Sequence, residues 1–446
     1  MFFKKKKLNI QQLAMSNLSI ELQADLLCQQ NLYYSILNNT KLSDSYAYII
    51  ALAATGKKIE AIQQLTQFEK KTDFEKYRLK LLKGLLPFLP HISFSLLDSH
   101  ILKKEKLLVT SLLSFLNKKN DLAPILQNLS LEDKKKQPEF FLIENHADLK
   151  PHEKLNNINL YLGVHSLLPI NLINSEKCLY INNIRSEKIK NFENNKALPL
   201  VSILVTVYNR EKLIKNCLLS LIYQSYENKE IIVIDDASSD NSVNIIKELA
   251  QVYSQIKLIE LKNNVGTFIA KNIGAKSAVG EFITCHDSDD WAHPQKLEKQ
   301  ITPLLNKPNL IATFSKWIRL TETGSPYSRF ISPITRLNPS SALFRRELVE
   351  QSMGLWDCVR TGADSEFNQR LKLNFPNRTL NVNLPLTLGS HHPDSLMNTE
   401  ETGYISGVST QRLEYWETWN KWHIQCLKEN KLPKLPVFDI YTIKNR

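Results

Sequence analysis

Between residues 198 and 290 the sequence alternates between short apolar runs and amphipathic stretches. The apolar runs are rich in Val, Ile and Leu, as buried strands are: VSILVTVY (201–208), EIIVIDD (230–236), IKLIEL (256–261) and GEFITCHD (280–287). Between them, apolar residues recur every three or four positions, which is typical of helices. Apolar strands that alternate with helices form a parallel sheet covered on both faces. This segment therefore predicts an α/β fold.

Polar residues follow each of the predicted strands, and in such sheets ligands bind at the carboxyl ends of strands. The strand ends read Tyr208-Asn209-Arg210, then Asp235-Asp236, then His286-Asp287-Ser288-Asp289. Asp287, Asp289 and Asp290 lie within four residues, and carboxylates this close repel one another unless a positive group, usually a metal ion, gathers them. At period two, Asp287 and Asp289 would project in the same direction.

Residues 200–300 resemble the family 2 glycosyltransferases, which have the GT-A fold. Five pieces match in the same order: VSILVTVYNR, SLIYQSY, EIIVIDDASSDNS, NNVGTFIAKNIGAKSAVGEFI and DSDDWAHPQKL. The resemblance implies a GT-A (Rossmann-like, mostly parallel) domain that transfers a sugar with inversion. It implies a nucleotide-diphosphate donor, most often a UDP-sugar, and a divalent cation, Mn²⁺ or Mg²⁺. That cation would stabilise charge on the leaving diphosphate.

The resemblance also implies roles for the residues at the strand ends. Asp289 corresponds to the metal ligand and Asp287 to a ribose and metal contact, with Asp290 in support; the alternative for DSDD is a solvated turn or helix cap. Asp235 and Asp236 correspond to carboxylates that bind the nucleotide base, and their alternative is helix capping. The remaining residues expected around the donor are Thr206, Tyr208, Arg210, Asn264, Gly266, Lys271 and Ser288. For Gly266 a plain helix start, and for Lys271 a solvated helix face, are equally good interpretations.

A second motif of the same family is similar to residues 340–375, on the acceptor side. A Gly-x-Trp-Asp turn there leads to acids at a helix start, where Asp364 corresponds to the catalytic base and Glu366 to a second acid. Ala363 stands where many relatives have Glu, which leaves Asp364 the clearer base. Inversion requires one carboxylate to deprotonate the acceptor hydroxyl. Taken alone, these acids would suit a helix N-terminus.

His391 and His392 follow a strand-like run, and some GT-A enzymes complete the metal site with a histidine from this region. Asp289 with one histidine suits Mn²⁺ better than Mg²⁺, because imidazole is a softer donor. We expect His391 to be that ligand; the alternative is a pair of surface histidines.

The rest of the chain of 446 residues is long enough for further domains. We expect an all-α domain at 1–130, a connector at 131–197, the GT-A domain at 198–400 and a helical tail at 401–446. ALAATGKKIEAIQQL resembles one tetratricopeptide-like hairpin hinged at Gly56, although a plain bundle fits as well. On the tail, Trp416, Trp419 and His423 share one helical face, which favours packing, with a lipid interface as the alternative.

The net charge of +12 indicates an anionic partner without deciding which. We expect no nucleic-acid partner; the acceptor would be a glycan or lipid-linked glycan such as capsule or lipopolysaccharide. The six scattered cysteines, the lack of a signal peptide and the lack of a long apolar run favour a cytoplasmic protein. The Lys4–Lys7 run predicts peripheral contact with the anionic inner-membrane leaflet.

Other functions fit the sequence less well. A nucleotidyltransferase would have a Gly-rich phosphate loop after the first strand, and a dinucleotide dehydrogenase would have GxGxxG; VTVYNREKL offers neither. A non-catalytic helical scaffold with a degenerate transferase domain is the remaining alternative, and the presence of Asp287, Asp289 and Asp364 weighs against it.

Overall fold

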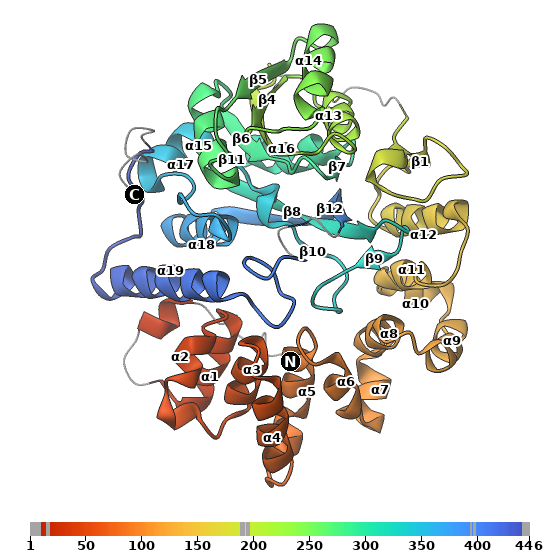
Figure 1. Ribbon diagram of the computed structural model, residues 1–446, viewed down its shortest axis with the longest axis vertical. Coiled ribbons are helices and arrows are strands. Elements are labelled where there is room, and N and C mark those ends of the chain that lie inside the picture. Colours follow the sequence, from red (N-terminus) through yellow and green to blue (C-terminus); the bar gives the residue numbers. More distant parts are fainter. Residues whose placement is uncertain are drawn as a thin grey trace. The chain divides into compact units, whose positions relative to one another are not determined.

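The computed structural model describes residues 10–14, 18–187, 192, 197–392, 395 and 398–438. Its contacts divide the chain into two compact units (Figure 1). Unit 1 comprises Met1–Asn117, Arg329–Ile331 and Pro393–Pro433, and unit 2 comprises Lys118–Ser328, Ser332–His392 and Lys434–Arg446. These boundaries differ from those expected at 130 and 400, and the division into separate domains stays a prediction. The Lys4–Lys7 run lies outside the described residues.

Unit 1 is built from short helices, as the apolar spacing of residues 8–130 predicts. The turn between α3 and α4 contains Gly56 at φ +85, a conformation that glycine adopts without strain. α3 and α4 therefore form a helical hairpin, and every residue of α3 except Tyr48 is buried. The helices of this unit are α1 (Ile20–Gln29), α2 (Tyr33–Leu37), α3 (Tyr46–Ala54), α4 (Lys58–Phe68), α5 (Phe74–Leu85), α6 (Pro90–Ser95), α7 (Ser99–Lys104), α8 (Lys106–Phe115) and α19 (Thr410–Lys428), with 3-10 turns η1 (Ile10–Ala14) and η2 (Thr40–Leu42).

The aromatic face of α19 is a packing face. Trp416, Trp419 and His423 are all buried. Glu417, on the same helix, accepts hydrogen bonds from the Ser35 backbone N at 2.9 Å and from Ser35 Oγ at 2.6 Å. A helix far along the chain thus completes the core of the N-terminal helices.

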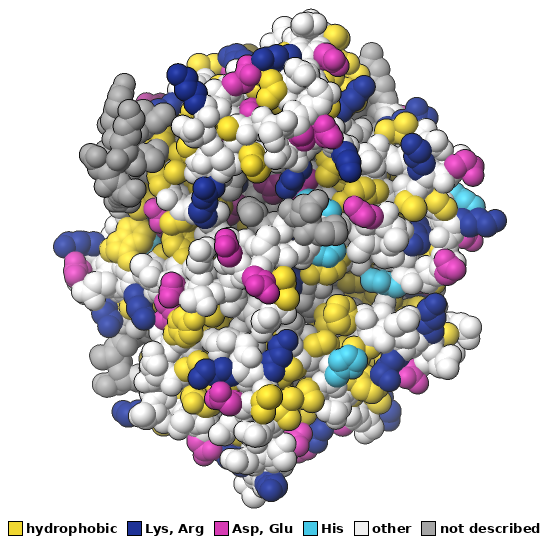
Figure 2. Space-filling model, in the orientation of Figure 1, with side chains coloured by type: hydrophobic (Ala, Val, Ile, Leu, Met, Phe, Trp, Pro, Cys, Tyr) yellow, Lys and Arg dark blue, Asp and Glu magenta, His cyan; other side chains and the backbone are white. Residues whose placement is uncertain are grey.

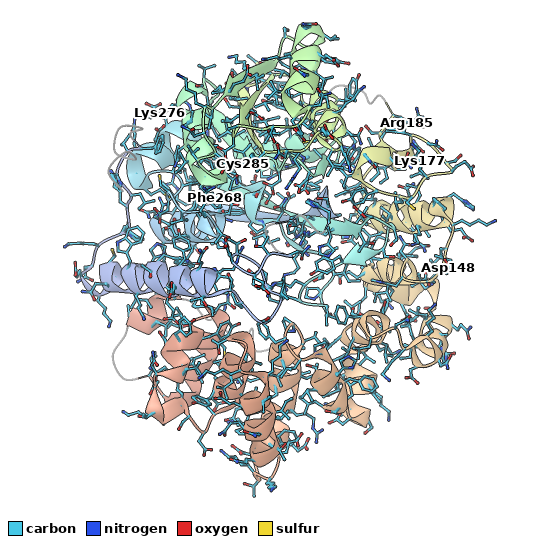
Figure 3. All side chains as sticks on the ribbon, viewed as in Figure 1. Asp148, Lys177, Arg185, Phe268, Lys276 and Cys285 are labelled. Atoms are coloured by element: carbon cyan, nitrogen blue, oxygen red, sulfur yellow. The ribbon has the colours of Figure 1, made fainter. Side chains whose placement is uncertain are left out.

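Unit 2 begins with α9 (Lys119–Gln127), which the sequence assigns to the helical domain. The segment expected as a connector follows and has structure of its own. It contains α10 (Leu131–Lys136), α11 (Glu139–Glu144), α12 (Pro151–Val164), β1 (Asn171–Leu172), η3 (Ile181–Asn183) and β2 (Ile184–Arg185). β1 and β2 pair as a small antiparallel sheet. Lys177 and Arg185 mark this part of the chain in Figure 3.

The main sheet of unit 2 has the order β5-β4-β3-β6-β11-β8-β12-β7. The first four strands are parallel, as predicted. The second half is mixed, because β11 runs antiparallel to both neighbours while β12 is parallel to β8. The strands are β3 (Val201–Val207), β4 (Lys229–Asp235), β5 (Ile256–Glu260), β6 (Phe282–Cys285), β7 (Trp291–Ala292), β8 (Ala312–Thr321), β9 (Pro326–Tyr327), β10 (Arg336–Leu337), β11 (Leu343–Arg345) and β12 (Thr379–His391).

Helices cover both faces of this sheet, and successive strand residues supply two separate cores. Ile203 and Val205 of β3 belong to a cluster with α13, α14 and α16, whereas Leu204 belongs to a cluster with α15, α17 and α18. Phe268 and Cys285, labelled in Figure 3, lie in the second cluster. The helices are α13 (Ile214–Ile222), α14 (Ser242–Val252), α15 (Thr267–Ser277), α16 (Lys296–Asn306), α17 (Arg346–Met353) and α18 (Ala363–Asn374), with the 3-10 turn η4 (Pro339–Ser341). This confirms the predicted α/β fold preceded by a helical region.

Across the part of the chain that the structure describes, none of the helices combines the length and the apolar character needed to cross a bilayer.

Candidate functional site

The candidate site lies beyond the carboxyl ends of β3, β4 and β6, which are adjacent parallel strands. Val207 pairs with Asp235, and Leu204 pairs with Cys285, so these strands bring their polar ends to the same edge. The polar residues that the sequence places after each strand therefore meet there, as predicted.

Asp287 and Asp289 diverge in direction, because the chain turns immediately after β6. The Asp290 backbone N donates to the Asp287 carbonyl at 3.1 Å, which makes 287–290 a turn. Asp287 Oδ2 lies 3.1 Å from Ser340 Oγ, whereas Asp289 Oδ2 lies 3.0 Å from His392 Nε2. The expectation that both carboxylates project the same way is wrong, since period two applies only to extended backbone.

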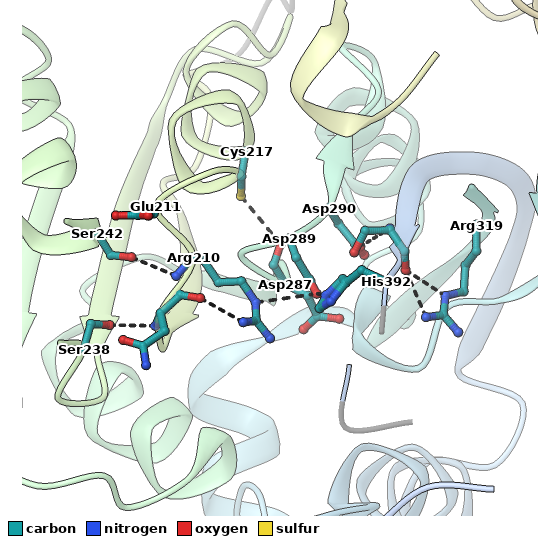
Figure 4. Close-up of polar contacts among 12 residues, drawn as sticks. Arg210, Glu211, Cys217, Ser238, Ser242, Asp287, Asp289, Asp290, Arg319 and His392 are labelled. Carbon is teal, nitrogen blue, oxygen red and sulfur yellow. Dashed lines mark hydrogen bonds and ion pairs between the residues drawn. The ribbon is translucent and has the colours of Figure 1, made fainter. Parts of the chain in front are cut away.

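Asp289 is held by cationic and imidazole groups (Figure 4). Besides His392, the Arg210 guanidinium approaches, with Nε 3.9 Å from Asp289 Oδ2. Burial raises the pKa of Asp289, but the hydrogen bond from His392 and the charge of Arg210 outweigh it and lower that pKa. Asp289 therefore carries its negative charge at neutral pH.

Asp290 supports the end of β12. Its Oδ1 accepts from the Ser390 backbone N at 3.0 Å, and Arg319 donates to the Ser390 carbonyl at 2.9 and 3.1 Å (Figure 4). Burial and the charges of Asp289 and Asp287 raise the pKa of Asp290 well above its usual value. Asp290 thus fixes the strand that carries the histidines.

The histidine at the carboxylates is His392, which corrects the sequence-based choice of His391. The His391 ring stacks on Tyr327, with centroids 3.6 Å apart and planes 5° from parallel. His391 is the last residue of β12, and it is the next residue, His392, whose ring meets Asp289. His392 is buried, which also argues against a pair of surface histidines.

Asp364 lies in the first turn of α18 and contacts two residues across the site. Lys271 Nζ lies 3.1 Å from Asp364 Oδ1 and 3.2 Å from Oδ2, and Ser340 Oγ lies 3.2 Å from Oδ2. Lys271 is only 2% exposed, so its interpretation as a solvated helix face is wrong. Burial lowers the pKa of Lys271, but the Asp364 carboxylate and other nearby acids outweigh burial and raise it. Lys271 is therefore a charged, buried partner of Asp364.

Glu366 points into the core and does not share the site with Asp364. Its two oxygens accept from Arg370 Nε at 2.7 Å and from Arg370 Nη2 at 2.8 Å, and both side chains are almost fully buried. Arg370 also donates to the carbonyl of Gly354 at 3.0 Å. The proposal of Glu366 as a second catalytic acid is therefore corrected, because helical spacing turns its side chain away from that of Asp364.

Asp235 and Asp236 both accept hydrogen bonds from loop backbone, but only Asp235 has a carboxylate oxygen without a partner among the described residues. Asp236 accepts from the backbone N of Val265 at 2.7 Å and from that of Gly266 at 2.8 Å, which fixes the loop before α15. Asp235 Oδ2 accepts from the Ser238 backbone N at 3.0 Å. Its Oδ1 is buried and has no hydrogen-bond partner among the described residues. A buried acceptor without a donor is costly, so Asp235 is the better candidate of the two for a ligand.

The other residues predicted to bind the nucleotide-sugar donor surround the same strand ends. Thr206 Oγ1 lies 2.7 Å from Thr267 Oγ1, Tyr208 is 47% exposed, and Ser288 is buried. Gly266 is the residue before the first turn of α15, at φ +91, so its interpretation as a helix start fits the geometry. Asn264 Oδ1 accepts from Arg360 Nη1 at 2.6 Å.

The protein supplies much of the positive charge around these acids itself. Lys296 is buried, and its Nζ lies 3.0 Å from His286 Nδ1. Burial lowers the pKa of Lys296 to about 8 and lowers that of His286 well below its usual value, so the lysine donates to a neutral imidazole. Lys271, Arg210 and Arg319 add further charge. Clustered carboxylates therefore do not by themselves require a metal here.

No group of three or more His, Cys, Asp or Glu side chains in the described ranges is arranged to hold a metal ion. Asp289 Oδ2 and His392 Nε2 nevertheless lie 3.0 Å apart, as a facing oxygen and nitrogen. Carboxylate with imidazole is a donor pair that Mn²⁺ accepts. Asp289 and His392 are therefore the two residues that could serve as protein ligands of a cation here.

Sequence reasoning missed several residues at the site. Ser340 lies in the short 3-10 turn η4 and Arg360 in the loop between α17 and α18, where no periodicity predicts which side chain turns inward. Lys296 could have been suspected from its position in DSDDWAHPQKL, six residues after the acids. The sequence favours His391 over His392, because it does not define the end of the β12 strand to the residue.

The sequence model of the family described as "Glycosyl transferase family 2" matches residues 202–358, which include β3, β4, β6 and the DSDD turn. Residues 202–358 belong to glycosyl transferase family 2. This glycosyltransferase segment contains Asp235, Asp287 and Asp289, whereas Asp364 and His392 lie beyond the matched residues. Its mixed sheet, parallel in the first half, is of the GT-A type.

Curated relatives of the glycosyltransferase segment include bacterial proteins. One, described as an uncharacterized glycosyltransferase of Haemophilus influenzae, is 40% identical over 120 residues, which are 27% of this chain and 48% of the relative. Another, a putative teichuronic acid biosynthesis glycosyltransferase of Bacillus subtilis, TuaG, is 29% identical over 145 residues, 32% of this chain and 57% of the relative. The chain thus spans about half the length of these relatives.

Solved glycosyltransferases also align with part of the chain. TarS 1–349 of S. aureus in complex with UDP-GlcNAc aligns with a TM-score of 0.40 and 20% identity, over 52% of this chain and 71% of the solved TarS chain. The mannosyltransferase PcManGT of Pyrobaculum calidifontis, in complex with GDP-Man and Mn²⁺, has a TM-score of 0.37 and 17% identity, over 54% and 76%. At these scores neither structure bears on the ligands of this chain.

Proposed function

We propose that this chain is an inverting, metal-dependent glycosyltransferase that uses a nucleotide-diphosphate sugar, most simply a UDP-sugar. The observation that carries the proposal is the approach of Asp287 and Asp364 to the same hydroxyl, Ser340 Oγ, at 3.1 and 3.2 Å. A carboxylate from the donor edge of the sheet and one from the start of α18 thereby meet at one side chain. Transfer needs such a meeting of groups, with the donor on one side and a base on the other.

The donor nucleotide would lie across the ends of β3 and β4. Asp235 Oδ1, buried and without a described partner, is placed to accept the N–H of a base such as uracil. Tyr208 is exposed at the end of β3 and offers a ring for the base to pack on. Arg210 would contact the diphosphate, because its guanidinium already lies at the carboxylate edge. Thr206, Asn264 and Gly266 would line this site.

Asp289 and His392 would hold the cation, with Asp287 contacting the ribose or the metal. Mn²⁺ suits this pair better than Mg²⁺ because of the imidazole. When bound, the cation would neutralise the diphosphate and stabilise the charge on the departing nucleoside diphosphate. Arg210 would add to this stabilisation from the protein side.

Asp364 would act as the base. The acceptor hydroxyl attacks the anomeric carbon from the face opposite the diphosphate, a new C–O bond forms, and the bond from that carbon to the diphosphate oxygen breaks. The hydroxyl proton passes to an Asp364 carboxylate oxygen. Lys271 would keep that carboxylate oriented, since it contacts both oxygens from a buried position.

The acceptor we propose is a growing bacterial surface glycan such as capsule or lipopolysaccharide, free or lipid-linked. The bacterial relatives support this class, among them one named for teichuronic acid biosynthesis. The enzyme would act in the cytoplasm, with peripheral contact between the Lys4–Lys7 run and the anionic inner-membrane leaflet. On the face drawn in Figure 2, Lys and Arg side chains are scattered among acids.

A screen of nucleotide sugars tests the catalytic proposal. The full chain is incubated with UDP- and GDP-sugars, with and without Mn²⁺, and thermal stabilisation and release of the nucleoside diphosphate are measured. We expect one UDP-sugar to stabilise the fold and to be consumed only with Mn²⁺. Binding without turnover toward any acceptor glycan would favour the non-catalytic scaffold, and no binding would contradict the donor assignment.

Removal of residues 1–7 tests the membrane contact. We expect less sedimentation with vesicles containing anionic lipid at low salt and unchanged turnover on a soluble acceptor. Equal sedimentation of the parent and the shortened chain would refute this part of the proposal.

A further inference from the structure

Ser340 is a serine between two acids, and the sequence gives no indication of its importance. It is 7% exposed and lies in η4, the 3-10 turn between β10 and β11. Its Oγ lies 3.1 Å from Asp287 Oδ2 and 3.2 Å from Asp364 Oδ2. Among the described residues these two carboxylates are the only hydrogen-bond partners of the Ser340 hydroxyl.

The position of Ser340 is fixed by groups other than its hydroxyl. Its backbone N donates to Asn338 Oδ1 at 3.0 Å, and Asn368 Nδ2 donates to the Pro339 carbonyl at 2.8 Å. Asn368 lies on α18, the helix that carries Asp364, so turn η4 and the start of α18 are tied together. The Ser340 hydroxyl is therefore not needed to hold its own backbone in place.

The neighbouring serine shows what a structural hydroxyl does in the same turn. Ser341 Oγ lies 2.6 Å from the Asn338 carbonyl and 3.1 Å from the Ser315 carbonyl, and it accepts from the Ser315 backbone N at 3.0 Å. Within the described part of the chain its hydrogen-bond partners are all backbone groups and none is an acid. Of the two serines in this turn, Ser341 thus binds backbone groups, whereas Ser340 contacts the acids of the site.

A serine hydroxyl has one hydrogen and can donate to one carboxylate at a time. Asp287 and Asp364 therefore compete for it. A ligand that engages Asp287 from the donor side would leave the hydrogen to Asp364, and a hydrogen bond to an ionised group is worth more than a neutral one. The arrangement has two states that differ in which acid receives the hydrogen.

We propose that Ser340 is a positioning residue that couples donor binding at Asp287 to the orientation of Asp364. Before the donor binds, Asp287 and Asp364 share the hydroxyl. Once the donor engages Asp287, Ser340 donates to Asp364 and, together with Lys271, holds this carboxylate toward the acceptor hydroxyl. This inference rests on the proposed function, because it assigns Asp287 to the donor and Asp364 to the base.

The test compares Ser340→Ala, Ser340→Thr and the control Ser341→Ala in the full chain, with the nucleotide sugar found by the screen. For Ser340→Ala we expect kcat to fall by about 10- to 100-fold, the range for losing a hydrogen bond to a charged group. The KM for the donor should stay near that of the parent. Ser340→Thr, which keeps a hydroxyl, should recover most of kcat. Ser341→Ala should lower the melting temperature and leave kcat near the parent value.

A second measurement separates positioning from stability. Hydrogen exchange at the start of α18 is compared with and without UDP and Mn²⁺. We expect the ligands to slow exchange there in the parent but not in Ser340→Ala, while β4 is protected in both. Parent-like kcat in Ser340→Ala, or equal ligand protection of α18 in both proteins, would overturn the inference and leave the proposed function intact. Absence of transfer by the parent would instead contradict the proposed function.

Discussion

The acidic turn 287–290 and the acidic helix start 363–366 use their carboxylates in the same two ways. In the turn, Asp287 and Asp289 face the site while Asp290 holds the Ser390 backbone. In the helix, Asp364 faces the site while Glu366 pairs with buried Arg370. Each cluster thus combines acids that face the candidate site with one acid that holds the surrounding structure. The neighbours of an acid in the sequence do not reveal which role it has. The direction in which the backbone points its side chain does.

Among the acids of the two clusters, Asp289→Ala should have the largest effect on activity, because it removes the carboxylate that faces His392. We expect transfer to fall below detection and UDP affinity to weaken only when Mn²⁺ is present. Calorimetric titration of UDP with and without Mn²⁺ measures this, and Asp44→Ala, an exposed acid paired with Lys71, is the control. Equal UDP affinity of Asp289→Ala and the parent in Mn²⁺ would refute the metal role.

Asp364→Asn should lower kcat by ~10²–10⁴, the usual contribution of a positioned base. Asparagine keeps an oxygen for Lys271 but cannot take a proton, so the donor KM should barely change. Glu366→Gln is the matched variant on the same helix, and any turnover it loses should follow the loss of folded protein. If Glu366→Gln abolished turnover while Asp364→Asn kept it, the two roles would be exchanged.

Glu366→Gln should in turn have the larger effect on stability. Breaking a buried ion pair from one side costs ~3–5 kcal/mol, since the partner charge stays buried. We expect urea unfolding to show a loss of this size for Glu366→Gln and a smaller one for Asp364→Asn, whose carboxylate is 17% exposed. Similar losses in both variants would show that both acids are structural.

His392→Ala should raise the Mn²⁺ concentration needed for half-maximal activity by about 10- to 100-fold, as removal of a group supporting a metal site does. His391→Ala is the control, because His391 stacks on Tyr327 and does not face Asp289. We expect its Mn²⁺ requirement to match that of the parent. A shift in His391→Ala alone would restore the sequence-based choice.

Prediction from the sequence succeeded where short-range pattern controls structure. The parallel strands β3 to β6, the helix-rich N-terminal region and the gathering of polar strand ends follow from periodicity and from the geometry of parallel sheets. The antiparallel strand β11 in the middle of the sheet did not follow, because a three-residue strand carries too little pattern. The direction of Asp289 was missed because the strand ends two residues before Asp287.

The sequence by itself determined the α/β fold, the edge of the sheet where the acids meet and the identity of most of them. The alternation of apolar residues and the ends of strands are local properties, so they can be predicted without knowing the distant contacts. Only the tertiary structure decided that Lys271 faces Asp364, that Glu366 belongs to Arg370, that His392 rather than His391 meets Asp289, and that Ser340 lies between Asp287 and Asp364. Most of these pairings join residues far apart in the chain. Their partners are chosen by how helices and loops pack on the sheet, which no local spacing encodes.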